Sequence, residues 1–228
     1  MAVYRRTDSA KSWRRRLQAS TRLGLTLFAA AGTAAAQPAS GDKTDALATL
    51  DKFVAEVHSL TAEFRQEVQT DQEKLVDTGT LSFERPNRFR WMSRKPNELV
   101  VVTDGKTMWQ YDVELAQVTR APVDESNDSS PASLLAGDRS ARDRFDVLDT
   151  YRQDGLEWVK LAPKAADSGF ASVLIGFDGL APRQLQLVDS LNHVTTVALD
   201  KVVLNPALAA SVFEFKAPPN VEVIGGER

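Results

Sequence analysis

The residues with the clearest potential for chemistry form the stretch RPNRFRW, residues 85–91, which places three arginines and two large aromatic residues within seven positions. Interleaved basic and aromatic residues are typical of a nucleic-acid groove, in which cations contact phosphates and rings stack on bases. The first hypothesis is therefore that this stretch contacts a polyanion. The alternatives are that its arginines lie in solvent or contact something else.

The other reactive side chains do not combine into a recognisable catalytic set. The two histidines are His58, expected on the first helix, and His193, expected at the start of a strand, and neither has a partner at the spacing of a metal site. The chain has no cysteine, which excludes thiol catalysis and thiolate metal ligands. Nucleophile-elbow, phosphate-loop and zinc-protease motifs are also missing from the sequence. We therefore predict a protein that is not an enzyme and that needs no cofactor or metal.

The N-terminus has the organisation of an export signal. Residues 1–22 carry seven basic residues and one acidic residue, followed by the apolar run Leu23–Gly32 and by small residues ending in AAAQ. This order is typical of a secretory signal peptide, and the apolar run is shorter than the roughly 20 residues that span a bilayer. We expect residues 1–36 to be a signal peptide cleaved after Ala36, leaving one domain over residues 37–228.

Cleavage makes the chain more acidic. Losing seven basic residues and one acidic residue takes the totals from 28 and 31 to 21 and 30, a net charge of −9. Nucleic-acid binding depends on many Lys and Arg contacts to phosphates, and an anionic membrane surface attracts the same side chains. An exported chain this acidic is a poor candidate for either, and we predict no nucleic-acid partner.

Hydrophobic periodicity indicates the elements that position RPNRFRW. Apolar residues recur at helical spacing across residues 45–60, which predicts an amphipathic helix. From Leu60 the period changes to two, which is typical of a strand. About ten further β-rich runs follow, separated by short turn signals such as residues 85–87 and 104–106. The pattern predicts an antiparallel sheet or barrel.

One interruption between the strand runs predicts short helices. Ser130 suits an N-cap, the proline after it suits the first helical position, and Gly137 suits the position after the end. Leu134 and Leu135 form the apolar face of this helix. Because so short a helix is stable only when docked, we expect a flap of low stability. The expected short helices are Pro131–Ala136 and Arg139–Arg144.

Strand alternation separates the three arginines if the register continues through the bend at Pro86. Arg88 and Arg90 then face solvent, whereas Arg85 lies in register with an apolar row, where an unsatisfied guanidinium costs several kcal/mol. Arg85 either reaches water at the turn or donates to the unpaired carbonyls at the end of a docked helix such as Pro131–Ala136. The apolar row consists of Leu81, Phe83, Phe89 and Trp91.

The sequence resembles the periplasmic outer-membrane lipoprotein carrier proteins, the LolA family, over essentially the whole mature chain. RPN-x-F-x-W and DGK-x-x-W-x-Y at this spacing are specific in combination. The matching stretches are L-x-K-F and L-x-A-x-F-x-Q within 50–66, GTLSFERPNRFRW at 79–91, DGKTMWQYDVELAQVT at 104–119, SSPASLLAG at 129–137 and FEFKAPPNVEVI at 213–224.

The resemblance implies a mainly β fold with a few helices: an incomplete antiparallel β-barrel whose N-terminal helix and short lid helices cover a hydrophobic cavity. It implies a monomeric periplasmic chaperone that takes acylated lipoproteins from an inner-membrane ABC transporter to an outer-membrane receptor lipoprotein, without a cofactor. By motif position, Arg85 would bond the lid and Phe89 would be the cavity-side aromatic that matters for ligand handling. The residues expected at the site are Leu81, Phe83, Phe89 and Trp91 in the cavity and Pro131, Leu134 and Leu135 in the lid helix.

Three other functions compete with the carrier. The outer-membrane receptor is itself a lipoprotein and needs an N-terminal cysteine, which this chain lacks. An exported hydrolase would need a catalytic set. An envelope lipid-binding or lipoprotein-binding sensor on the same half-barrel is the alternative that stays open.

Overall fold

The computed structural model describes residues 45–69, 74–94, 98–123, 131–137, 139–165 and 168–225. The expected signal peptide, its cleavage site at Ala36 and the expected N-cap Ser130 lie outside these residues. Within the described ranges, no helix combines the length and the apolar character needed to cross a membrane.

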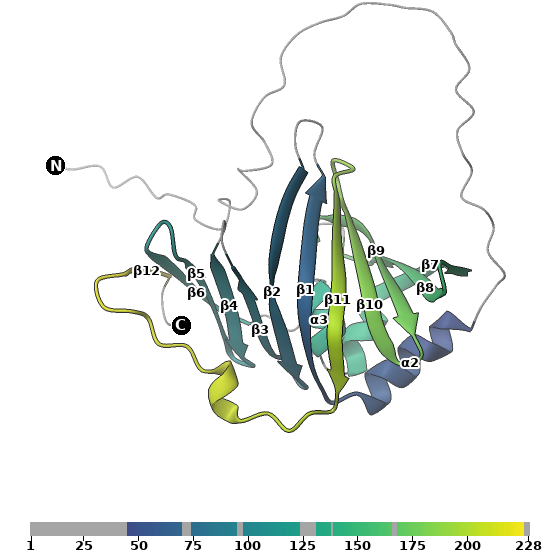
Figure 1. Cartoon of the computed structure of the whole chain (residues 1–228), viewed down its shortest axis with the longest axis horizontal. Coiled ribbons are helices and arrows are strands. Elements are labelled where there is room, and N and C mark those ends of the chain that lie inside the picture. The colour runs from purple at the N-terminus through teal and green to yellow at the C-terminus, as the bar shows by residue number, and fades with distance from the viewer. Residues whose placement is uncertain are drawn as a thin grey trace, which may run out of the picture. The chain divides into compact units, whose positions relative to one another are not determined.

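Twelve strands form one sheet, in the order β12-β6-β5-β4-β3-β2-β1-β11-β10-β9-β8-β7 (Figure 1). All neighbouring strands are antiparallel except β12 and β6, which are parallel. Because β7 and β12 form the two edges, the described part of the sheet does not close, and the predicted incomplete antiparallel barrel is confirmed. The strands are β1 Ser59–Gln69, β2 Lys74–Glu84, β3 Arg88–Ser93, β4 Leu99–Asp104, β5 Thr107–Asp112, β6 Gln117–Pro122, β7 Phe145–Gln153, β8 Leu156–Pro163, β9 Phe170–Asp178, β10 Ala181–Asp189, β11 Val194–Leu204 and β12 Glu222–Ile224.

Among the described residues the helical elements are few, and all except the one at Ala210–Phe213 lie where the sequence predicted helices. The first expected helix is α2, and it buries the side chains that recur at helical spacing, among them Leu50 and Phe53. The two short helices predicted between the strand runs are both present, the second as a 3-10 helix. The elements are α2 Ala46–Glu56, α3 Pro131–Ala136, η2 Arg139–Arg144 and η3 Ala210–Phe213.

The C-terminal end of α2 is fixed by Asn205, which directly follows β11. The side-chain amide of Asn205 donates to the carbonyl oxygen of Glu56 at 3.1 Å, and its side-chain oxygen accepts from the backbone amide of His58 at 2.7 Å. These bonds satisfy groups that a helix end leaves unpaired. His58 is exposed and follows the helix, so its predicted position on the helix is wrong.

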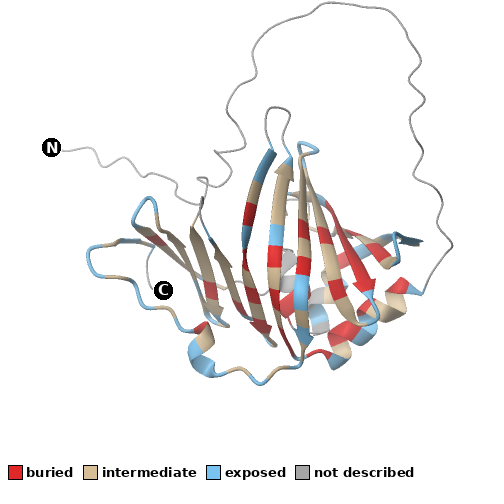
Figure 2. Cartoon of the chain, in the orientation of Figure 1, coloured by how far each residue is buried: buried red, intermediate tan, exposed pale blue. Residues whose placement is uncertain are grey.

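The main core lies between the sheet and the helices α2 and α3, on the face of the sheet that we call the inner face. Figure 2 shows buried residues gathered where these helices meet the strands. Strands β2 and β3 contact α3, and β7 and β8 contact α2. Full burial of each large apolar side chain contributes about 1.5–3 kcal/mol to folding. Fully buried members include Phe53, Phe83, Phe177, Leu81, Leu134, Leu161 and Ile175.

The opposite, outer face of the sheet carries a second apolar cluster covered by the C-terminal segment. Val102 and Val118 alternate onto this face and are fully buried, while η3 packs on β3 and β4 with Phe213 buried. Arg90 Nη1 donates to the carbonyl oxygen of Val212 at 2.9 Å. The prediction that Arg90 is only a solvent-facing residue is therefore wrong, because it anchors the C-terminal segment.

Candidate functional site

The four residues predicted to form an apolar row lie directly opposite one another on β2 and β3. Leu81 pairs with Trp91 and Phe83 pairs with Phe89, so all four point to the inner face. Leu81, Phe83 and Phe89 are buried, and Trp91 is partly buried against the same core. The alternation thus continues through the turn Arg85–Asn87, which places Arg88 on the other face, exposed and paired with Glu84 at 2.7 Å.

Arg85 joins the ends of both inner-face helices. Its Nε donates to the carbonyl oxygen of Val57, the residue after α2, at 2.9 Å. Its Nη1 donates to the carbonyl oxygen of Gly137, the residue after α3, at 2.5 Å. Of the two arrangements left open by the sequence, the structure has the second, in which the guanidinium donates to a carbonyl oxygen at a helix end. The bond to Val57 was not foreseen.

The surroundings of Arg85 explain how a cation is accommodated beside an apolar core. Its guanidinium carbon lies 5.4 Å from the ring centroid of Phe53 and 5.5 Å from that of Phe83. Cation–π attraction contributes about 0.5–2 kcal/mol in such positions. The helix C-termini also present the negative ends of their dipoles to the positive charge. These contacts and the hydrogen bonds offset the free-energy cost of removing the charge of Arg85 from water.

The backbone of the same turn binds α3 a second time. The amide of Asn87 donates to the carbonyl oxygen of Ala136 at 2.8 Å. Asn87 has a φ of 61°, a left-handed conformation that asparagine tolerates better than most residues. The turn therefore donates hydrogen bonds to two successive carbonyl oxygens at the end of α3, those of Ala136 and Gly137. A six-residue helix is unstable alone, and these bonds add to the burial of Leu134 and Leu135.

An aromatic stack crosses the inner face beside this site. The rings of Phe64 on β1 and Trp91 on β3 are stacked with centroids 3.6 Å apart and planes 23° apart. Between them on β2 lies Gly79, where an added Cβ would come within 2.5 Å of the Phe64 ring and 1.9 Å of the carbonyl oxygen of Met92. The indole nitrogen of Trp91 donates to Ser93 Oγ at 3.1 Å. We did not foresee this stack from the sequence, although a glycine within a β-rich run was a usable signal.

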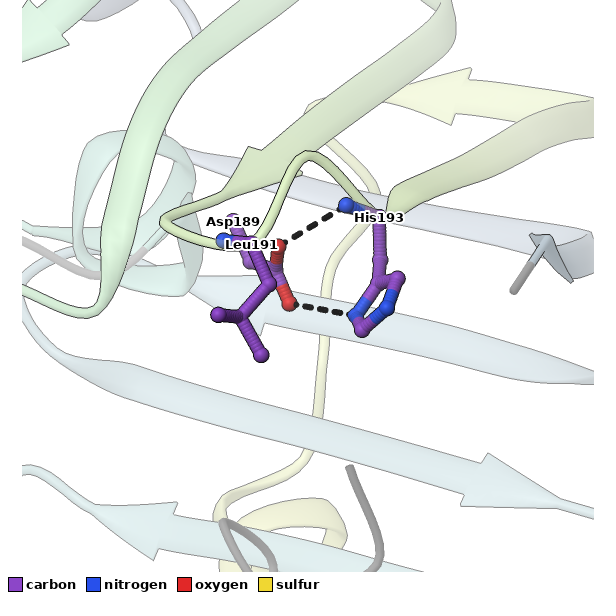
Figure 3. A network of polar contacts seen from close by, with 3 residues as sticks. All are labelled: Asp189, Leu191 and His193. Carbon is purple, nitrogen blue, oxygen red and sulfur yellow. Dashed lines mark hydrogen bonds and ion pairs between the residues drawn. The ribbon is translucent and has the colours of Figure 1, made fainter. Parts of the chain in front are cut away.

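His58 adjoins the Arg85 turn through its backbone, because its carbonyl oxygen accepts a hydrogen bond from the backbone amide of Arg85 at 2.7 Å. His193 belongs to the turn between β10 and β11, where Asp189 receives the backbone amides of Leu191 and His193 and lies 3.0 Å from His193 Nδ1 (Figure 3). This contact holds the turn together. Among the described residues, no group of three or more His, Asp or Glu side chains is placed to hold a metal ion.

Comparison with known proteins identifies the family. The sequence model described as "Outer membrane lipoprotein carrier protein LolA" matches residues 55–216. This chain belongs to the LolA family. A LolA-family relative from Methylobacillus flagellatus, named outer-membrane lipoprotein carrier protein, is 39% identical over 185 residues, covering 80% of this chain and 90% of its own. A relative of the same name from Bordetella avium is 36% identical over 206 residues, covering 90% and 99%.

The solved structures are more distant. A LolA superfamily protein from Nitrosomonas europaea aligns with a TM-score of 0.44 and 9% identity, covering 75% of this chain and 96% of the other. The membership of this chain in the LolA family thus rests on its sequence. The main structural features described for this family member are the unclosed twelve-stranded sheet and the Arg85 turn.

Proposed function

We propose that this protein is a periplasmic carrier that binds the acyl chains of lipoproteins released from the inner membrane and delivers them to an outer-membrane receptor. The observation that carries the proposal is an apolar inner face closed by a short helix, α3, whose last carbonyls are held by one arginine turn. The names of the relatives support it. We further propose that the protein is a binding protein without catalytic activity, cofactor or metal.

The physical demand of lipoprotein transport fits such a site. Burial of an acyl chain is favoured by about 0.8 kcal/mol per CH₂ group, so a lipoprotein with three chains does not cross an aqueous space unaided. A carrier must offer an apolar surface of comparable extent. In this structure, Leu134 and Leu135 of α3 occupy part of that surface. We infer that ligand entry requires α3 to move, and we call α3 the lid.

The proposed ligand-contacting residues are Leu81, Phe83, Phe89 and Trp91 on the inner face. Loading would exchange the buried contacts of Leu134 and Leu135 for contacts with acyl chains. The bonds from the Arg85 turn to α3 exist in the closed state, so they favour that state. We infer that Arg85 acts as a lid latch and assists release of cargo at the receptor.

The remaining features of the proposal concern export and partners. Residues 1–36 are proposed to be a signal peptide cleaved after Ala36, and residues 37–228 a single monomeric carrier domain. The proposed partners are acylated lipoproteins, an inner-membrane ABC transporter that releases them and an outer-membrane lipoprotein receptor.

The proposal is tested by expressing the full chain and purifying the protein from the periplasm. Mass spectrometry of the native protein should detect bound acylated lipoproteins. The matched control is Phe89→Glu, which places a charge at the buried end of the inner-face row and should reduce the bound fraction. Ligand-free protein that takes up no lipoprotein when reconstituted with the transporter would contradict the carrier function and favour a sensor.

A further inference from the structure

Thr103 at the end of β4 connects two turns that lie far apart in the sequence. Its Oγ1 accepts a hydrogen bond from the amide of Gly105 at 3.0 Å and donates one to the carbonyl oxygen of Asn87 at 3.2 Å. A threonine hydroxyl has one proton, so the bond from Gly105 leaves that proton available for Asn87. The hydroxyl thus links the turn after β4 to the turn that binds α3.

The backbone carbonyl and the backbone amide of Asn87 are both hydrogen-bonded. Its carbonyl binds Thr103, and its amide binds the carbonyl oxygen of Ala136 at 2.8 Å. Since the direction of the amide depends on the backbone angles of Asn87, fixing the carbonyl restricts where the amide points. The left-handed φ of 61° shows that this backbone occupies a conformation with few alternatives.

The turn after β4 is itself rigid. The Asp104 carboxylate receives the amides of Lys106 and Thr107, both at 2.8 Å. Partial burial raises the pKa of Asp104, but these amide bonds and the charge of Lys106 outweigh that effect and hold the pKa below its usual value. Gly105 has a φ of 95°, a conformation that side chains rarely adopt. Because this turn holds the Gly105 amide in place, the hydrogen bond that Thr103 Oγ1 accepts from it has a fixed direction.

We propose that Thr103 is a positioning residue that strengthens closure of the lid through the series Gly105, Thr103, Asn87 and Ala136, which we call the Thr103 relay. The relay fastens α3 through the backbone, independently of the side chain of Arg85. It accounts for the joint presence of the RPN and DGK motifs, because the relay joins the two turns that they form. The role of the relay in controlling loading and release rests on the proposed carrier function.

The relay is tested in ligand-free protein, produced from the full chain, by measuring how often α3 opens. Because the chain has no cysteine, a single reporter can be introduced as Leu135→Cys, at a position 4% exposed. Thr103→Val removes the hydroxyl at similar volume, and a loss of about 1 kcal/mol, the typical contribution of one hydrogen bond, should raise thiol labelling of the reporter about fivefold. Thr103→Ser keeps the hydroxyl and should label like the parent.

A second reporter, Ile175→Cys, lies fully buried on β9 and reports opening of the sheet. Its labelling should not change in Thr103→Val. Hydrogen–deuterium exchange of residues 131–137 gives the same comparison without a cysteine substitution. Unchanged labelling and exchange of α3 in Thr103→Val, or equal increases at positions 135 and 175, would overturn the relay. Either result leaves the carrier function standing, whereas failed lipoprotein uptake with an intact relay would overturn the carrier function alone.

Discussion

Arg85 and Gly137 lie 52 positions apart, yet Arg85 Nη1 donates to the carbonyl oxygen of Gly137 at 2.5 Å. The same guanidinium binds the carbonyl oxygen of Val57, so one side chain contacts the ends of both inner-face helices. Because the two helices pack on one core, the position of α3 is coupled to that of α2 through Arg85 as well as through apolar contacts. Movement of α3 alone must break the bond to Gly137.

Arg85→Leu is expected to load lipoprotein and to deliver it poorly. Leucine suits the apolar surroundings but donates no hydrogen bonds, and each bond from a charged donor contributes about 1.5–3 kcal/mol. With the closed state weakened, cargo is retained, and transfer to the receptor should slow at least about tenfold. A reconstituted transfer assay measures this, with Arg88→Leu on the outer face as the control. Normal delivery by Arg85→Leu would contradict the latch.

Phe89→Glu is expected to disturb delivery much more than Arg88→Glu. Phe89 is 9% exposed on the inner face, so a carboxylate there meets apolar surroundings and repels acyl chains. Arg88 is exposed, and its replacement by Glu loses a surface ion pair with Glu84, worth about 1 kcal/mol or less. It also places a carboxylate opposite Glu84 and Asp104, a repulsion that solvent screens at this exposed position. The measurement is lipoprotein transfer by folded protein, checked by circular dichroism. Equal defects in the two variants would show that the inner face is not the ligand site.

The alternation of apolar residues predicted the strands and the faces of residues 81–91, and the cap and turn residues at 130–137 predicted the helix whose end accepts a hydrogen bond from Arg85. The strands, faces and helix depend on residues that are close in the sequence, and the contact of Arg85 with the helix end was suggested by the charge of Arg85. Contacts set by the tertiary path were missed: Val57 as a partner of Arg85, and the anchoring of Val212 by Arg90. Strand β12, three residues long and parallel to β6, was missed as well, because so short a segment has no clear period.

Gly79→Ala is expected to destabilise the protein by about 3 kcal/mol, the upper part of the range for overpacking. The added methyl group would meet the Met92 carbonyl at 1.9 Å and the Phe64 ring at 2.5 Å, and the backbone cannot rotate away as a side chain can. Gly176→Ala is the matched control. It also faces an aromatic residue on a neighbouring strand, but its nearest contacts are side-chain atoms of Trp158 and Leu156 at 3.0–3.1 Å.

Urea unfolding of the two glycine variants measures the difference directly, since the free energy of unfolding falls linearly with urea concentration. The Phe64–Trp91 stack should be lost together with stability in Gly79→Ala, which near-ultraviolet circular dichroism detects. Similar losses of stability in Gly79→Ala and Gly176→Ala would contradict the close contact of Phe64 with the strand backbone.

Asp104→Asn is expected to reduce stability at neutral pH and to have a smaller effect in acid. The amides of Lys106 and Thr107 hold the pKa of Asp104 in the folded protein below 3.8, its ordinary value, despite the opposing effect of partial burial. A depressed pKa contributes stability that is fully present above about pH 4 and is lost as the pH falls through the folded-state pKa. Asparagine keeps an oxygen acceptor for the turn but not the charge.

The difference in free energy of unfolding between the parent and Asp104→Asn should therefore stay constant from pH 7 to about pH 5 and shrink below pH 4. Asp112→Asn, at the start of the following turn, serves as the control, since within the described part of the chain its side chain accepts one hydrogen bond, from the amide of Leu115 at 3.0 Å. If the turn after β4 supports the Thr103 relay, labelling of the Leu135→Cys reporter should rise in Asp104→Asn and not in Asp112→Asn. A difference that grows toward low pH would have the wrong sign for a carboxylate stabilised in its charged form.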